Sequence, residues 1–152
     1  MTIKLQRICV PVDFSETSAA ALLYAKALAD AFGASLHIMH VLVAWVPNAD
    51  FPASPEMYAS FEEAARKQLD AQLTAEEKAK YRATVELVMG TSEFVEVIRY
   101  AREKEIDLLV LGTHGRGAIA HMLMGSVAEK IVRKAPCPVL TVRHPEHEFV
   151  MP

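Results

Sequence analysis

The chain has 152 residues, a length that fits one ordinary domain and is too short for two well-cored ones. Apolar residues make up 52% of it and charged residues 23%, which is the balance of a packed globular protein and excludes a disordered one. Sixteen lysines and arginines stand against nineteen acids, so the formal net charge is −3. This charge excludes an overall basic surface that would bind nucleic acid non-specifically, although it leaves room for a local basic site.

The sequence gives no sign of a membrane or secreted protein. No apolar run approaches the roughly 18 to 20 residues that cross a bilayer, and the first residues lack the apolar stretch of a signal peptide. Cys9 and Cys137 are the only cysteines and lie in separate apolar runs, so no disulfide framework is indicated. We therefore expect a cytoplasmic protein that does not act on membranes or nucleic acid.

The first third of the chain predicts a strand, a helix and a second strand. Residues 8–12 are short, apolar and β-branched, as in a buried strand. Ser15 is a candidate N-cap for a helix over residues 16–32, and Gly33 suits a left-handed turn just after that helix. A second strand is predicted over residues 36–42. The apolar face expected on the helix comprises Leu22, Ala25, Ala29 and Phe32.

The middle of the chain predicts a loop and one long helix. Residues 43–55 contain three prolines and read as a surface loop. Ser54 followed by Pro55 is a typical helix start, and the helix is expected to continue to about Lys80. Its expected buried stripe comprises Met57, Phe61, Ala65, Leu69 and Leu73.

The last part of the chain continues the alternation of strands and helices. Strands are predicted over residues 85–89, 106–111 and 138–142, with a helix opening at Ser92 and another near residues 127–134. In all, five short apolar runs alternate with four helical segments. This pattern predicts an α/β fold with one open parallel sheet covered by helices on both faces, and residues 1–152 as a single domain.

Ligands of such sheets bind beyond the carboxyl ends of the strands, so the turns there are the candidate sites. The turn after the fourth strand contains Gly112, Gly115, Gly117 and Gly125. Glycines allow positive φ angles and a close approach of the main chain to a ligand, and free amides in such a turn bind anions. A helix start follows at once and favours the same kind of ligand. Arg116 adds a cation and Ser126 a hydroxyl, which completes a candidate phosphate site.

Structural explanations stand beside this hypothesis. Ser126 and Glu129 have the spacing of a capping box, and the glycines are also compatible with a tight surface turn. Asp13, after the first strand, could cap the first turn of the following helix. The segment is not a Walker P-loop, and a nicotinamide or flavin dinucleotide is disfavoured because no acid follows the fifth strand.

Three blocks of the sequence together resemble one known family. Gly112, Gly115, Gly125 and Ser126 have the spacing Gly-x2-Gly-x9-Gly-Ser, and residues 8–13 and 135–142 resemble the first and last strands of the same family. The family is the universal stress proteins, in their ATP-binding subgroup. The resemblance covers nearly the whole chain and is weakest over residues 43–80.

The resemblance implies a Rossmann-like fold of the adenine nucleotide alpha hydrolase type, with strand order 3-2-1-4-5. This order would bring the ends of the first and fourth strands together. The ribose and adenine side of the implied site comprises Pro11, Val12, Asp13 and the main chain of Val41. The phosphate side comprises Gly112, Gly115, Arg116, Gly125, Ser126 and Val127.

The resemblance further implies a cytoplasmic ATP-binding regulatory protein of the stress response, without a catalytic residue. Mg²⁺ would be held by the phosphates, because the sequence offers no metal-ligand set: His37 and His40 are three apart on a strand and point to opposite faces. A homodimer is expected through the segment from Val139 to Arg143. An unknown regulatory protein is expected as a further partner. Two alternatives stay open. One is a slow ATPase or phosphotransferase in which Ser126 is modified, and the other is an interaction module without nucleotide.

Overall fold

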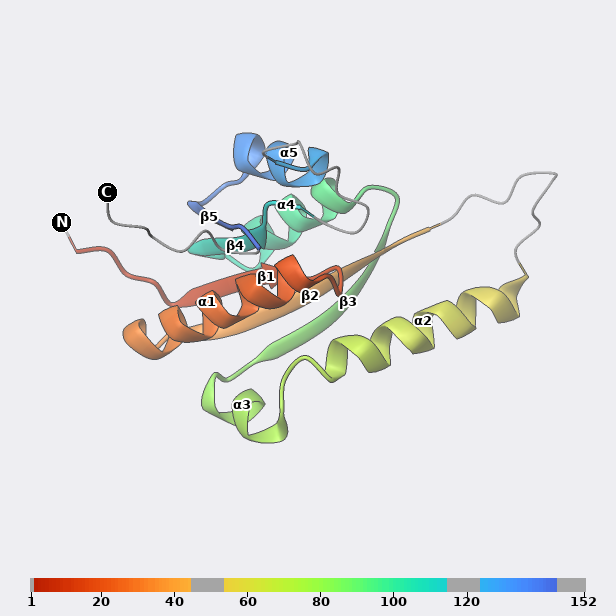
Figure 1. Cartoon of the computed structure of the whole chain (residues 1–152), viewed down its shortest axis with the longest axis horizontal. Helices are drawn as coiled ribbons and strands as arrows, with labels where there is room; N and C mark the ends of the chain where they lie inside the picture. The colour runs from red at the N-terminus through yellow and green to blue at the C-terminus, as the bar shows by residue number, and fades with distance from the viewer. Residues whose placement is uncertain (1, 45–53, 115–123, 145–152) are drawn as a thin grey trace.

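The computed structural model describes residues 2–44, 54–114 and 124–144. Its centre is a five-stranded parallel sheet with the order β3-β2-β1-β4-β5 (Figure 1), which confirms the predicted fold and strand order. The elements along the chain are β1 (Arg7–Pro11), α1 (Glu16–Phe32), β2 (Ser35–Val43), α2 (Pro55–Asp70), α3 (Ala75–Lys80), β3 (Thr84–Gly90), α4 (Glu93–Glu103), β4 (Leu108–Gly112), α5 (Ser126–Lys134) and β5 (Val139–Val142).

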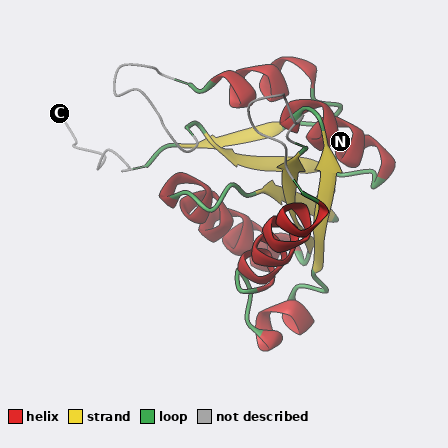
Figure 2. Ribbon diagram, turned by 90° about the vertical axis from the view of Figure 1, so that its right-hand side faces the viewer, coloured by secondary structure: helices red, strands yellow, loops and turns green. Residues whose placement is uncertain are grey.

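Helices cover both faces of the sheet. Alternate residues of the strands point to opposite faces, which gives two separate apolar clusters. The cluster around Ile8, Val10 and Ile38 packs against α1 and the end of α2. The cluster around Cys9, Met39 and Leu109 packs against α4 and α5. Figure 2 shows the sheet lying between these two helical layers.

The boundaries of α1 follow from local hydrogen bonds, as predicted. The Ser15 hydroxyl accepts a hydrogen bond from the Ser18 amide at 3.2 Å, which caps the helix start. At the other end Gly33 adopts φ 64°, and its amide donates to the Ala29 carbonyl. The predicted burial of one residue on the apolar face is wrong: Phe32, in the last turn, is 51% exposed.

The prediction of one long helix to about Lys80 is wrong, because the segment forms two helices. α2 ends at Asp70, and α3 begins after Thr74. Thr74 accepts from the Glu77 amide at 3.1 Å, while the Glu77 carboxylate accepts from the Thr74 amide at 2.9 Å. This reciprocal capping box stabilises a new helix start and therefore interrupts the run.

The predicted buried stripe of α2 is only half covered. Leu69 and Leu73, at and just beyond its end, are 2% and 4% exposed and join the core. Met57 and Phe61, on the same stripe near its start, are 47% and 58% exposed. Figure 1 shows the reason, since the first turns of α2 extend beyond the sheet.

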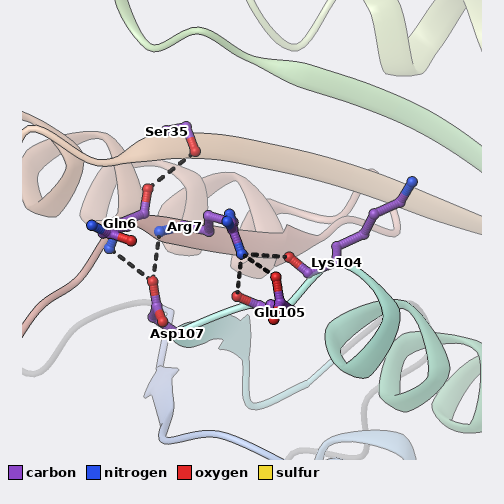
Figure 3. A network of polar contacts seen from close by, with 6 residues as sticks. All are labelled: Gln6, Arg7, Ser35, Lys104, Glu105 and Asp107. Carbon is purple, nitrogen blue, oxygen red and sulfur yellow. Dashed lines mark hydrogen bonds and ion pairs between the residues drawn. The ribbon is translucent and has the colours of Figure 1, made fainter.

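At the amino ends of the strands, a polar network ties β1 to the turn before β4 (Figure 3). One oxygen of the Asp107 carboxylate accepts hydrogen bonds from the amides of Gln6 and Arg7, at 2.8 and 2.9 Å. The Arg7 guanidinium donates to the carbonyls of Lys104 and Glu105, both at 3.3 Å. These bonds fix the two central strands at the end of the sheet opposite the predicted site.

Two expectations from composition can be compared with the structure. Cys9 and Cys137 are both free thiols, as predicted, and burial raises the pKa of Cys9 far above its ordinary value. Within the part of the chain that the structure describes, no helix is long and apolar enough to cross a membrane.

Candidate functional site

The strand order places a topological switch point between β1 and β4. From β1 the chain continues through α1 to β2 on one side, and from β4 it continues through α5 to β5 on the other. α1, which follows β1, and α5, which follows β4, lie on opposite faces of the sheet, so the chain direction diverges between these two strands. Such a divergence is where open α/β sheets bind ligands. The strand order thus places side by side the ends of β1 and β4, whose following turns the sequence predicts as candidate sites.

Hydrogen bonds define the turn after β1, which contains Pro11, Val12 and Asp13. The Val12 amide donates to the Met39 carbonyl at 2.8 Å and so extends the pairing with β2 by one bond. Oδ1 of Asp13 accepts from the Ser15 amide at 3.0 Å. Asp13 therefore shapes the turn by a local bond, while Ser15 is the N-cap of α1. The alternative in which Asp13 itself caps the helix is wrong.

Sequence reasoning missed two residues of this turn region. Phe14 has φ 64°, a left-handed backbone conformation that bulky residues rarely adopt. His40, on β2, reaches across and places Nδ1 2.7 Å from the Val12 carbonyl oxygen. The rings of Phe14 and His40 lie 4.5 Å apart between centroids. No sequence signal marks the φ of Phe14, since glycine or asparagine is the usual residue in that conformation.

Val41, the predicted adenine contact, lies on β2 just beyond the part of that strand that pairs with β1. β1 pairs with β2 as far as Pro11 opposite Met39, and Val41 comes two residues further along β2. Because main-chain groups of alternate residues point to the same side of a strand, those of Val41 point toward β1, as those of Met39 do. They lie just beyond the last paired residue of β1.

On the β4 side, the packing of Gly112 differs from expectation. Positive φ was expected for the glycines of this loop, but among the described glycines only Gly33 has it. Gly112 is needed for a close approach within the protein: an added β-carbon would lie 2.6 Å from Cγ2 of Thr17. The absence of a side chain here lets the end of β4 contact the start of α1.

The amides beside the glycine loop are partly used by the protein itself. The Thr113 amide donates to the Val142 carbonyl at 2.9 Å, and the Gly125 amide donates to the Thr113 carbonyl at 2.6 Å. The sequence predicts free amides in this turn, but the amides of Thr113 and Gly125 already have protein partners. The next amides, of Ser126 and Val127, belong to the first turn of α5 and have no partner within that helix.

The alternative of a capping box at Ser126 and Glu129 is also wrong. The N-cap of α5 is Gly125, one residue earlier, and the Gly125 carbonyl accepts from the Glu129 amide at 2.9 Å. The carboxylate of Glu129 instead pairs with Arg133 at 2.9 Å. A glycine N-cap has no side chain to satisfy the first amides, so within the described residues the positive end of α5 has no side-chain cap from its N-cap residue.

Several predicted residues lie outside the described part of the chain. Gly115, Arg116 and Gly117 are among them. Their roles stay predictions. Of the residues predicted for the phosphate side, the structure describes Gly112, Gly125, Ser126 and Val127.

Glu93 makes the β1 side of the site acidic. It is the first residue of α4, just after the carboxyl end of β3. Burial and then the charge of Asp13 raise the pKa of its carboxyl group above the ordinary value. Two acids therefore lie near each other on the β1 side, whereas the positive end of α5 lies on the β4 side. Sequence reasoning missed Glu93, although it follows the end of a parallel strand as Asp13 does.

The histidines do not form a metal site in the described structure. Nδ1 of His37 lies 3.0 Å from the Tyr100 hydroxyl, on the face covered by α4, whereas His40 contacts Phe14 on the α1 face. This confirms the prediction that the two point to opposite faces. Across residues 2–44, 54–114 and 124–144, no group of three or more metal-ligating side chains occurs.

With this geometry established, comparison with known proteins identifies the family. The Universal stress protein family pattern matches residues 4–143. The chain belongs to this family. A universal stress protein of Thermus aquaticus is 34% identical over 140 residues, which cover 90% of this chain and 97% of the relative.

Solved structures of universal stress proteins share the fold. That of a universal stress protein from Lactobacillus plantarum superimposes with a TM-score of 0.72 at 25% identity, covering 93% of this chain and all of the other. A second, solved in complex with cAMP, has a TM-score of 0.61 at 27% identity and covers 92% of this chain and 98% of the other. The structural relatives of this chain thus include one that holds an adenine nucleotide.

Proposed function

We propose that this universal stress protein is a cytoplasmic ATP-binding regulator of the stress response, in which the bound nucleotide sets conformation or the choice of a protein partner. One observation carries the proposal: Asp13, just after β1, and Gly112, at the end of β4, follow neighbouring strands at the switch point, beside a start of α5 whose N-cap residue is a glycine without a side-chain cap. A helix start without a side-chain cap binds phosphate readily, and a switch point is the usual ligand crevice of this fold.

The residues fit an adenine nucleotide in one orientation. Asp13 uses Oδ1 for the Ser15 amide, and its carboxylate would accept from a ribose hydroxyl with the other oxygen. The main chain of Val41 would contact the adenine edge, and the amides of Ser126 and Val127 would bind phosphate. Gly115 and Arg116 would complete the phosphate side, with Mg²⁺ held by the phosphates. The cAMP complex of the structural relative supports an adenine ligand in this class of site.

The direct test is nucleotide binding by the purified protein. The protein is denatured, the released small molecules are identified by mass spectrometry, and the nucleotide-free protein is titrated with ATP, ADP, AMP and cAMP by calorimetry. We expect ATP to bind more tightly than AMP, because the added phosphates reach the start of α5. Absence of both a co-purified adenine nucleotide and measurable binding would overturn the proposal.

Asp13→Asn is the sharpest variant for the ribose contact. The amide oxygen still accepts from the Ser15 amide, so the turn is retained while the negative charge is lost. We expect weaker ATP binding, and a smaller difference between ATP and 2′- and 3′-deoxy-ATP than in the parent protein. Equal discrimination in both proteins would remove Asp13 from the ribose site.

A specific observation favours a second candidate, an interaction module without nucleotide. Gly112 has a packing reason independent of any ligand, and the amides of Thr113 and Gly125 already have protein partners. The same titration separates the two candidates, because the interaction module binds none of the four nucleotides.

The proposal includes a homodimer through β5. This strand forms one edge of the sheet, and residues 139–143 would pair with a second copy across a two-fold axis. Sedimentation equilibrium tests it: we expect a dimer whose dissociation constant rises when Val139 is replaced by aspartate. A monomer at all concentrations would refute the dimer without affecting the nucleotide site.

A further inference from the structure

His40 is joined by two contacts to the turn that carries Asp13. Its Nδ1 lies 2.7 Å from the Val12 carbonyl oxygen, and its ring centroid lies 4.5 Å from that of Phe14. A carbonyl oxygen can only accept, so the imidazole is the donor and carries a proton on Nδ1. His40 therefore contacts the residues immediately before and after Asp13.

These two contacts lie in a turn whose backbone conformation is unfavourable at Phe14. Phe14 has φ 64°, and a bulky residue keeps such an angle only where its surroundings hold it there. The bond from the Val12 amide to Met39 fixes the start of the turn, and the bond from the Ser15 amide to Asp13 fixes its end. His40 supplies a hydrogen bond and a ring contact between these two points.

We propose that His40 is a positioning residue of the nucleotide site, whose hydrogen bond to Val12 holds the strained turn so that the Asp13 carboxylate is set for the ribose. This inference rests on the proposed function and assigns a further residue to the same site. His40 itself needs no contact with the nucleotide. It acts through the main chain of Val12, from the neighbouring strand.

Two substitutions separate the hydrogen bond from the ring. His40→Asn places an amide nitrogen where Nδ1 lies and retains the donor. His40→Phe retains an aromatic ring against Phe14 and removes the donor. We expect His40→Phe to weaken ATP binding about tenfold, equivalent to about 1.4 kcal/mol, and His40→Asn to stay within about threefold of the parent protein. His40→Gln, whose amide lies one methylene further out, should behave like His40→Phe and serves if that variant does not fold.

A second measurement does not depend on the nucleotide. Amide hydrogen exchange of Ser15 in the ligand-free protein reports whether its bond to Asp13 is held. We expect faster exchange in His40→Phe and parent-like exchange in His40→Asn, while amides of the central strands stay protected in both. Parent-like exchange in His40→Phe would overturn the inference.

The two measurements also separate this inference from the proposed function. If the parent protein binds none of the nucleotides, the proposed function fails, and Ser15 exchange still decides whether His40 holds the turn. If the parent protein binds ATP, equal affinity in the parent and His40→Phe overturns the positioning role. Equal losses in His40→Asn and His40→Phe, with both proteins folded, overturn it as well, since rescue by the retained donor is what distinguishes positioning from general packing.

Discussion

The main chain of Gly112 lies directly against Thr17. A β-carbon built on the glycine would come within 2.6 Å of Cγ2 of Thr17 and 3.0 Å of its carbonyl carbon. Thr17 lies in the first turn of α1 and is 8% exposed, so it has little room to move away. The first glycine of the Gly-x2-Gly-x9-Gly-Ser spacing thus sets the distance between β4 and α1, in addition to any role toward a ligand.

Gly112→Ala is therefore expected to destabilise the ligand-free protein. Forcing a methyl group into this contact should lower the free energy of unfolding by about 1–3 kcal/mol, as overpacking does elsewhere. Gly125→Ala is the matched control: its β-carbon would lie 3.3 Å from the Thr113 carbonyl oxygen, and its φ of −70° suits alanine. Urea unfolding of both variants tests the difference. A smaller loss in Gly112→Ala than in Gly125→Ala would contradict the packing role.

Stability should depend on pH through His37. The residue is 9% exposed, and burial followed by the charges of Arg7 and Lys104 lowers its pKa below the ordinary value of 6.5. As the pH falls below 6.5, the unfolded chain takes up a proton at this residue before the folded protein does. The free energy of unfolding must therefore fall with it, until the pH reaches the lower folded-state pKa.

The matched variant for this effect is His37→Asn. It does not titrate, and its amide keeps a hydrogen-bonding group near the Tyr100 hydroxyl. Urea unfolding between about pH 8 and about pH 5 should show a shallower decline in the variant than in the parent protein. Parallel declines would show that His37 does not contribute to the pH dependence.

Asp107 should contribute more to stability than the exposed ion pair beside it. Asp107→Ala leaves the amides of Gln6 and Arg7 without their acceptor and should cost about 1–3 kcal/mol of unfolding free energy. Glu105→Gln removes only the pair with Arg7, whose side chains are 80% and 40% exposed, and should cost less than about 1 kcal/mol. Thermal or urea unfolding of the two variants gives the comparison, and equal losses would contradict it.

Two similar sequence patterns behave differently in this fold. Thr74 and Glu77 form a capping box, while Ser126 and Glu129, with the same spacing, do not. The second helix begins one residue earlier, with Gly125 as its N-cap, so Ser126 already lies inside the first turn. The spacing alone predicts a candidate cap, and the residue at which the helix begins decides whether that candidate is the N-cap.

The strands, the caps of α1 and the strand order could be predicted because each depends on local pattern or on the family resemblance. The φ of Phe14 and the contact between Gly112 and Thr17 could not, because both arise from packing between segments far apart in the chain. The proximity of Glu93 to Asp13 needed the sheet as well. These long-range contacts are the features that sequence periodicity describes least.

The two halves of the α2 stripe should respond differently to substitution. Leu69 is 2% exposed within the core, so Leu69→Ala should cost about 2–5 kcal/mol of unfolding free energy through the cavity it creates. Phe61 lies two turns earlier on the same stripe and is 58% exposed, so Phe61→Ala should cost less than about 1 kcal/mol. Urea unfolding at low protein concentration measures both. A loss of several kcal/mol in Phe61→Ala would mean that the first turns of α2 are covered in solution, contrary to the exposure described here.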